Sequence, residues 1–248
     1  MALDIRKALK KYIPVLLKAQ ADNLNEADTV QRIVKVFEDV LGYDALEEIT
    51  REASIKDKYC DLAIKIDGSV RLLVEAKSAG TTLRERHIDQ AQNYAAHSNL
   101  PWVLLANGVQ WTLFHLTFEE GIEATVAFDA DLAADADRAA ELLALLHRQS
   151  IAKGGLDEYW QHRSALGASS IGGALFMEPV LMLIRREIRR REGLLIDVED
   201  LGAALHGMLS TEAREQVGPF KIRRKRARRT AAPEPESAKG PAGEPPST

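Results

Sequence analysis

The sequence has a single cysteine, Cys60, and no long apolar run. One thiol cannot build a disulfide framework, and this usage fits a protein of the reducing cytoplasm. The longest apolar run is far too short to span a bilayer, so we expect no membrane association. The residues Met1-Ala2-Leu3-Asp4 lack the basic and then apolar order of a secretory signal peptide, which also favours a cytoplasmic protein.

Motifs for several kinds of site are missing as well. No Gly-x-x-x-x-Gly-Lys-Ser/Thr segment occurs, so the sequence predicts no phosphate-binding loop of an ATP-driven motor. Cys60 has no second thiol to share a metal or a disulfide, and we interpret it as a packing residue. The histidines are scattered without metal-ligand spacing, at His87, His97, His115, His147, His162 and His206.

Charge is spread unevenly along the 248 residues, although the net charge is only −4. Residues 221–230 carry seven Lys/Arg and no acid, whereas residues 231–248 carry three Glu and one Lys, so the first 220 residues carry −9. Any contact with nucleic acid must therefore come from local patches. Residues 218–248 are first basic and then rich in Pro, Ala and Glu, and we expect a disordered tail.

The hydrophobic periodicity predicts an α/β protein. We expect a mixed sheet flanked by helices over residues 1–130, because strands and helices alternate there. A helical region follows over residues 131–217, for oligomerisation or partner docking. The expected helices are 3–20, kinked or split at Pro14, then 25–41, 83–97, 133–150, 155–166, 174–192 and 197–209. The expected strands are 46–55, the hairpin 59–77, 101–106, 110–116 and 123–128.

The segment Tyr59–Lys77 organises the sheet, because apolar residues alternate on both sides of Asp67-Gly68-Ser69. A three-residue loop over 67–69 pairs residue 62 with residue 74, so apolar residues meet apolar residues. A two-residue turn would bury charges, and we do not expect it. The same register places Asp61 opposite Glu75, with Lys77 one step further. Two carboxylates and an ammonium group at one hairpin end suit a divalent cation and a polarised water.

Two neighbouring helices supply further candidates. Glu26 lies on the core-facing stripe of the helix 25–41, either as a site ligand or as an acid that complements the helix dipole, in a capping box with Asn23. Gln90 and Tyr94 are four residues apart and share one helix face. Taken alone, Lys77 could equally be a solvated strand end and Tyr94 a packed helix residue.

Six short motifs in order resemble those of the PD-(D/E)xK nucleases, and more narrowly those of the N-terminal nuclease domain of type I restriction-enzyme R subunits. They are Asn25-Glu26-Ala27-Asp28, Leu41-Gly42-Tyr43-Asp44, Tyr59-Cys60-Asp61, Val74-Glu75-Ala76-Lys77, Gln90-x-x-x-Tyr94 and Ala106-Asn107-Gly108-x-x-Trp111. The resemblance covers about residues 20–130. It implies a restriction-endonuclease-like core with the order α-β-β-β-α-β.

The resemblance also implies a metal-dependent DNA endonuclease of a restriction or anti-phage defence system, with RNA as the alternative substrate. Asp61 and Glu75 are hard oxygen ligands for Mg²⁺ or Mn²⁺. By resemblance, the Ala76 carbonyl also binds the metal, and Glu26 completes its shell. Lys77 would orient the attacking water or stabilise the developing charge. Gln90 and Tyr94 would position the substrate backbone or the network of Lys77 and water.

The sequence departs from the R-subunit pattern at Cys60, which replaces a proline, and in the missing motor. Translocation or target choice would then need a separate motor or specificity protein. The basic run that begins at Lys221 is a phosphate-binding arm, a docking segment or a solvated tail, and we favour the arm. We interpret the arginines of 185–191 as a polar helix face. The predicted nucleic-acid contacts are Lys56, Lys58, Arg223, Arg224, Lys225 and Arg226.

Two questions stay open from the sequence. The domain could instead be a DNA-binding or protein-interaction module with weak or no nuclease activity, although the intact Asp61, Glu75 and Lys77 argue against decay. The C-terminal helices could form a homodimer or dock another protein.

Overall fold

The computed structural model describes residues 5–55, 58–119 and 121–222, with only the backbone of residues 52–55, 58 and 59. Over these residues the chain forms two compact units, within the ranges Met1–Ala165 and Leu166–Thr248. Each unit has its own apolar core.

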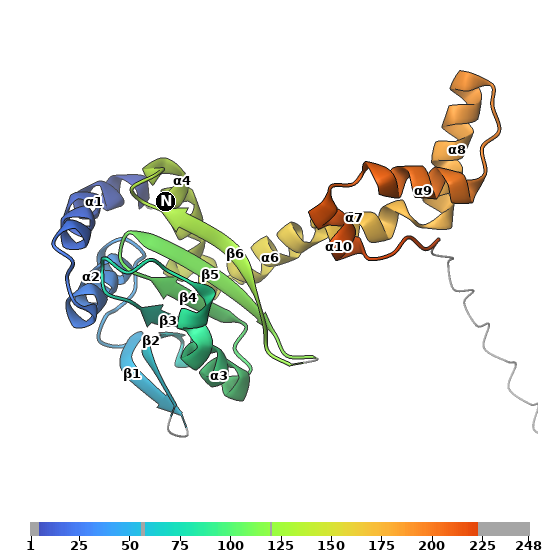
Figure 1. The fold of residues 1–248 in the computed structure, drawn as a ribbon. Helices are drawn as coiled ribbons and strands as arrows, with labels where there is room; N and C mark the ends of the chain where they lie inside the picture. The colour runs from blue at the N-terminus through green and yellow to red at the C-terminus, as the bar shows by residue number, and fades with distance from the viewer. Residues whose placement is uncertain (1–4, 56–57, 120, 223–248) are drawn as a thin grey trace, which may run out of the picture. The chain divides into compact units, whose positions relative to one another are not determined.

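The described part of the first unit contains a six-stranded mixed sheet whose strand order follows the chain (Figure 1). Strands β3 and β4 are parallel, and every other neighbouring pair is antiparallel. Parallel neighbours need a crossover, which η1 (Glu85–Ile88) and α3 (Asp89–Ser98) provide. The strands are β1 (Ile49–Ile55), β2 (Lys58–Ile66), β3 (Ser69–Ala76), β4 (Trp102–Ala106), β5 (Gln110–Thr117) and β6 (Glu123–Asp131).

Helices cover both faces of this sheet, as the α/β prediction requires. Figure 1 shows α3 on one side and α1, α2 and α4 on the other. The larger core cluster joins the sheet to the second group of helices, and a smaller cluster joins it to η1 and α3. The larger cluster includes α1 (Ile5–Ala21), α2 (Glu26–Asp39), α4 (Ala136–Leu143), η2 (Ala144–Leu146), α5 (Arg148–Ala152) and α6 (Gly155–Ala165).

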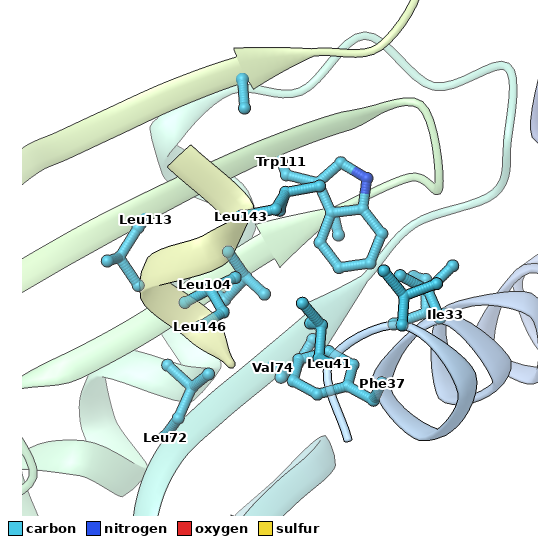
Figure 2. Packing of buried hydrophobic residues seen from close by; sticks show 14 of the residues in the cluster. Ile33, Phe37, Leu41, Leu72, Val74, Leu104, Trp111, Leu113, Leu143 and Leu146 are labelled. Atoms are coloured by element: carbon cyan, nitrogen blue, oxygen red, sulfur yellow. The ribbon is translucent and has the colours of Figure 1, made fainter. Parts of the chain in front are cut away.

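Figure 2 shows how the larger core is filled. The ring of Phe37 on α2 lies 6.1 Å from that of Trp111 on β5. Leu143 and Leu146 lie over Leu104 of the sheet and are fully buried. The helices between residues 131 and 165 are thus part of the sheet's core, and the first compact unit extends to Ala165. The boundary predicted near residue 130 cuts through this core.

The two N-terminal helices differ from the predictions in two features. Asn25 caps α2, and its side chain accepts a hydrogen bond from Asp28 N–H at 2.9 Å, so the predicted capping box with Asn23 is wrong. Helix α1 runs unbroken from Ile5 to Ala21 with Pro14 inside it, so Pro14 does not split the helix.

The hairpin confirms the predicted pairing at its open end and corrects its turn. Leu62 pairs with Val74, as predicted. The register then shifts between Ile64 and Lys65, and Ile66 pairs with Ser69. The turn therefore has two residues, Asp67 and Gly68, both with positive φ, and a β-bulge restores the alternation. The prediction omitted the bulge, which allows a two-residue turn without burying the charges.

The second unit is helical over its described residues, with Phe176, Leu181 and Leu201 at the centre of a small core. The helices are α7 (Ala168–Leu175), α8 (Glu178–Glu192), α9 (Val198–Met208) and α10 (Thr211–Val217). Helix α8 covers most of the helix predicted over 174–192, whose first residues belong instead to the end of α7. Most of α7 and all of α10 were not predicted. No described helix has both the length and the apolar character needed to cross a membrane.

Candidate functional site

The candidate site lies where β2 and β3 separate at the open end of the hairpin. β3 is paired with β4 up to Ala76, and the Lys77 N–H then donates to the Ala106 carbonyl at 2.9 Å. Across β2, Asp61 Oδ2 accepts a hydrogen bond from the Ala76 N–H at 2.7 Å. Since residue 62 pairs with residue 74, the register brings Asp61 to the position opposite Glu75.

Lys77 joins two carboxylates from different elements. Its Nζ donates to Glu75 Oε1 at 2.5 Å and lies 3.7 Å from Glu26 Oε2 at the first residue of α2. The Glu75 side chain is 6% exposed, that of Lys77 20% and that of Glu26 51%. Asp61, Glu75, Lys77 and Glu26 thus form one cluster, from a buried acid to a half-exposed one.

Hydrogen bonds from two other parts of the chain hold the segment that follows Lys77. The Ala79 N–H donates to the Leu24 carbonyl at 3.0 Å, which ties this segment to the loop before α2. The buried Asn107 donates to the Thr81 carbonyl at 2.9 Å, and its Oδ1 accepts from the Gln110 N–H at 2.7 Å. The sequence identified Asn107 only as part of the motif Ala106-Asn107-Gly108-x-x-Trp111. Its hydrogen bond to Thr81 depends on the fold, because residue 81 is distant in sequence.

The cluster has strongly perturbed acid–base properties. Burial raises the pKa of Glu75 to about 7, against the lowering effect of its hydrogen bond with Lys77, and the charges of Asp61 and Glu26 add to the rise. Burial alone would lower the pKa of Lys77, but the hydrogen bond to Glu75 and the nearby acids raise it above its ordinary value. The site therefore concentrates negative charge in a partly buried position, with one ammonium group to balance it.

The two predicted residues of α3 differ in burial. Tyr94 is buried in the core between α3 and the sheet, and burial raises its pKa. Gln90 is exposed at the start of α3. Within the described residues, neither side chain makes a hydrogen bond to Asp61, Glu75 or Lys77. Cys60 is buried in the same core, and burial raises the pKa of its thiol to about 12, which agrees with a packing role.

The predicted nucleic-acid contacts lie outside what the structure describes. Lys56, Arg223, Arg224, Lys225 and Arg226 are outside the described residues, and Lys58 is described only by its backbone in β2.

The donor set can be tested against the predicted metal ion. In the described part of the chain, no three His, Cys, Asp or Glu side chains lie close enough to form a metal group by themselves. Magnesium, however, usually keeps several waters and takes only one or two carboxylates from the protein. Asp61 and Glu75 each have one oxygen engaged in the contacts above, which leaves the second oxygen of each available. The oxygen-only donor set fits Mg²⁺ or Mn²⁺ with water completing the shell.

The segment from the cap of α2 to β6 contains every residue of this cluster. Residues 25–127 match the family model of the type I restriction enzyme R protein N terminus. This match confirms the resemblance that the sequence motifs predicted. It includes Glu26, Asp61, Glu75 and Lys77, and also Gln90 and Tyr94. No curated protein and no solved structure matches the chain.

Proposed function

We propose that the protein is a metal-dependent endonuclease that hydrolyses phosphodiester bonds of DNA, with a restriction-endonuclease-like core. The observation that carries this proposal is the meeting of Asp61, Glu75 and Lys77 at one hairpin end. It lies within a segment that matches the N terminus of a restriction enzyme subunit, which supports a role in a restriction or anti-phage system. We further propose a cytoplasmic protein that acts with a separate motor or specificity protein.

The residues assigned to the metal are Asp61, Glu75, the Ala76 carbonyl and Glu26, the last directly or through water. A bound Mg²⁺ or Mn²⁺ would neutralise charge on the scissile phosphate and lower the pKa of a water molecule. The raised pKa of Glu75 supports this assignment, because the buried carboxylate lacks enough positive charge nearby to stay fully ionised at neutral pH.

Lys77 has a protonated side chain at neutral pH and sits between two acids. We assign it the task of donating a hydrogen bond to a phosphate oxygen or to the attacking water. Gln90, exposed at the start of α3, would contact the substrate backbone, and Tyr94 would hold α3 against the sheet behind the site.

A plasmid-nicking assay with Mg²⁺ tests the assignment. We expect the wild-type chain to nick DNA, and Asp61→Ala and Lys77→Ala each to reduce the rate by at least about 100-fold, since each removes a group that acts on developing charge. Lys65→Ala, on the same hairpin, is the matched control and should leave the rate within about threefold of wild type. Cleavage that survives both site substitutions would overturn the active-site assignment.

The second candidate is a DNA-binding or protein-interaction module with little or no hydrolysis. The exposed apolar side chains of Met182 and Leu183 on α8 favour it, because the helices of the second unit would then be the working surface. Wild-type protein that binds DNA or RNA but cleaves neither with Mg²⁺ or Mn²⁺ would support this second function. If the protein cleaved RNA but not DNA, the proposed phosphodiester hydrolysis would stand and the substrate would be RNA.

A further inference from the structure

Helix α8 of the second unit has apolar residues on two faces. Leu181, Ile184 and Ile188 pack into the core of that unit. On another face, Met182 and Leu183 are 46% and 54% exposed. This exposed face borders a groove of about 340 Å³ lined by Pro179, Met182, Leu183, Arg185, Arg186, Arg189 and Leu195. An exposed apolar floor flanked by arginines marks an interaction surface.

Two of the arginines on α8 form no ion pair or hydrogen bond within the described residues, although the charge of Arg186 helps to lower the pKa of Glu187. Glu187 binds both Arg190 and Arg191 at 2.7 Å, and Arg185 Nε donates to the Ile196 carbonyl at 2.6 Å. Arg186 and Arg189 make neither an ion pair nor a hydrogen bond with any residue that the structure describes. The hydrogen-bond donors of both guanidinium groups are therefore available to carboxylates supplied from outside.

Unpaired acids lie across the next loop. Asp197, Glu199 and Asp200 at the start of α9 are exposed, and their side chains make no hydrogen bond or ion pair within the described ranges. Between them and α8, Leu194 and Leu195 are 65% and 67% exposed. The surface formed by the exposed face of α8, this loop and the start of α9 thus carries both charge signs around apolar side chains.

We propose that this surface binds the same surface of a second copy of the chain about a two-fold axis. In a two-fold interface every contact occurs twice, so Arg186 and Arg189 of each copy would meet Glu199 and Asp200 of the other. The exposed leucines and Met182 would be buried between the copies. A nucleic acid would satisfy the arginines but would leave the apolar floor uncovered and would face the acids, so a second copy fits better.

Sedimentation equilibrium of the full chain over a concentration series tests the proposal. We expect wild-type dimers, and at least about tenfold weaker association for the double variants Arg186→Glu/Arg189→Glu and Glu199→Arg/Asp200→Arg, because each places like charges opposite one another. In an equimolar mixture the two variants have opposite charges at both contacts, and we expect the dimer to return. Arg191→Glu, a charge reversal on the same helix, should leave association unchanged.

Three outcomes would overturn the proposal. They are a wild-type chain that stays monomeric, a double variant that dimerises like wild type, and a mixture that stays monomeric while both variants keep the wild-type melting curve. Loss of DNA binding in Arg186→Glu/Arg189→Glu without any change in mass would instead identify a nucleic-acid surface. None of these results depends on nuclease activity.

Discussion

At the scale of single residues, the buried acid Glu75 decides the electrostatics of the site. Its pKa of about 7 in the folded chain exceeds the ordinary value of 4.5. The folded state therefore holds the proton more tightly than the unfolded state. The resulting contribution to stability is complete below about pH 4.5 and is lost as the pH rises towards 7.

Metal-free protein should consequently become less stable between pH 5 and pH 8. This decrease in the free energy of unfolding should be up to about 3 kcal/mol, which corresponds to the difference between the two pKa values. We expect Glu75→Gln to remove it, because the amide does not ionise. Urea unfolding in EDTA at several pH values measures it, with Glu123→Gln on the exposed end of β6 as the control. If the free energy of unfolding of Glu75→Gln fell with pH as steeply as that of wild type, the raised pKa would not belong to Glu75.

Divalent metal should reverse this effect, because the ion favours the ionised carboxylates. At a metal concentration 100 times the dissociation constant, binding should raise the free energy of unfolding by about 2.7 kcal/mol. We therefore expect Mg²⁺ or Mn²⁺ to raise the melting temperature by several degrees. Asp61→Ala should abolish the shift and Lys65→Ala should keep it. A shift of equal size in Asp61→Ala, measured by thermal unfolding at pH 7, would place the metal elsewhere.

At the scale of elements, two glycines on α9 have opposite expected effects. A Cβ at position 202 would collide with the Phe220 ring, whereas nothing lies within 4 Å of a Cβ at position 207. We expect Gly202→Ala to destabilise the second unit by about 1–3 kcal/mol through overpacking. Gly207→Ala should stabilise it by up to about 1 kcal/mol through helix propensity. Thermal or urea unfolding of the full chain compares them, and equal effects would contradict the packing of Phe220 on α9.

At the scale of the whole molecule, the position of the domain boundary can be tested by truncation. The clusters that line the sheet end at Trp160, and the core of the second unit begins at Leu175. We expect residues 1–165 to unfold cooperatively by themselves. A chain cut at residue 130 loses the buried Leu142, Leu143, Leu146, Ile151 and Leu156.

At about 1.5–3 kcal/mol each, those five side chains account for as much as the whole stability of an ordinary domain. The shorter chain should therefore lack a cooperative unfolding transition. Circular dichroism during urea unfolding distinguishes the two chains. A cooperative transition in the chain ending at residue 130 would restore the boundary predicted from the sequence.

The sequence by itself determined the alternation of the hairpin, the pairing of Leu62 with Val74 and the neighbourhood of Asp61 and Glu75. These follow from period-two patterning, because a one-residue slip would bury charges. Most element positions were also predictable, since they depend on local periodicity and capping. The family motifs in residues 25–127 are short and contiguous, so they too could be read directly.

Only the tertiary structure decided the remaining features. The two-residue turn needs a bulge between Ile64 and Lys65, which alternation alone does not reveal. The contact between Lys77 and Glu26 and the bond from Asn107 to Thr81 join segments far apart in sequence. The packing of α4 to α6 on the sheet depends on which apolar faces meet, because an amphipathic helix shows that it needs a partner but not which one.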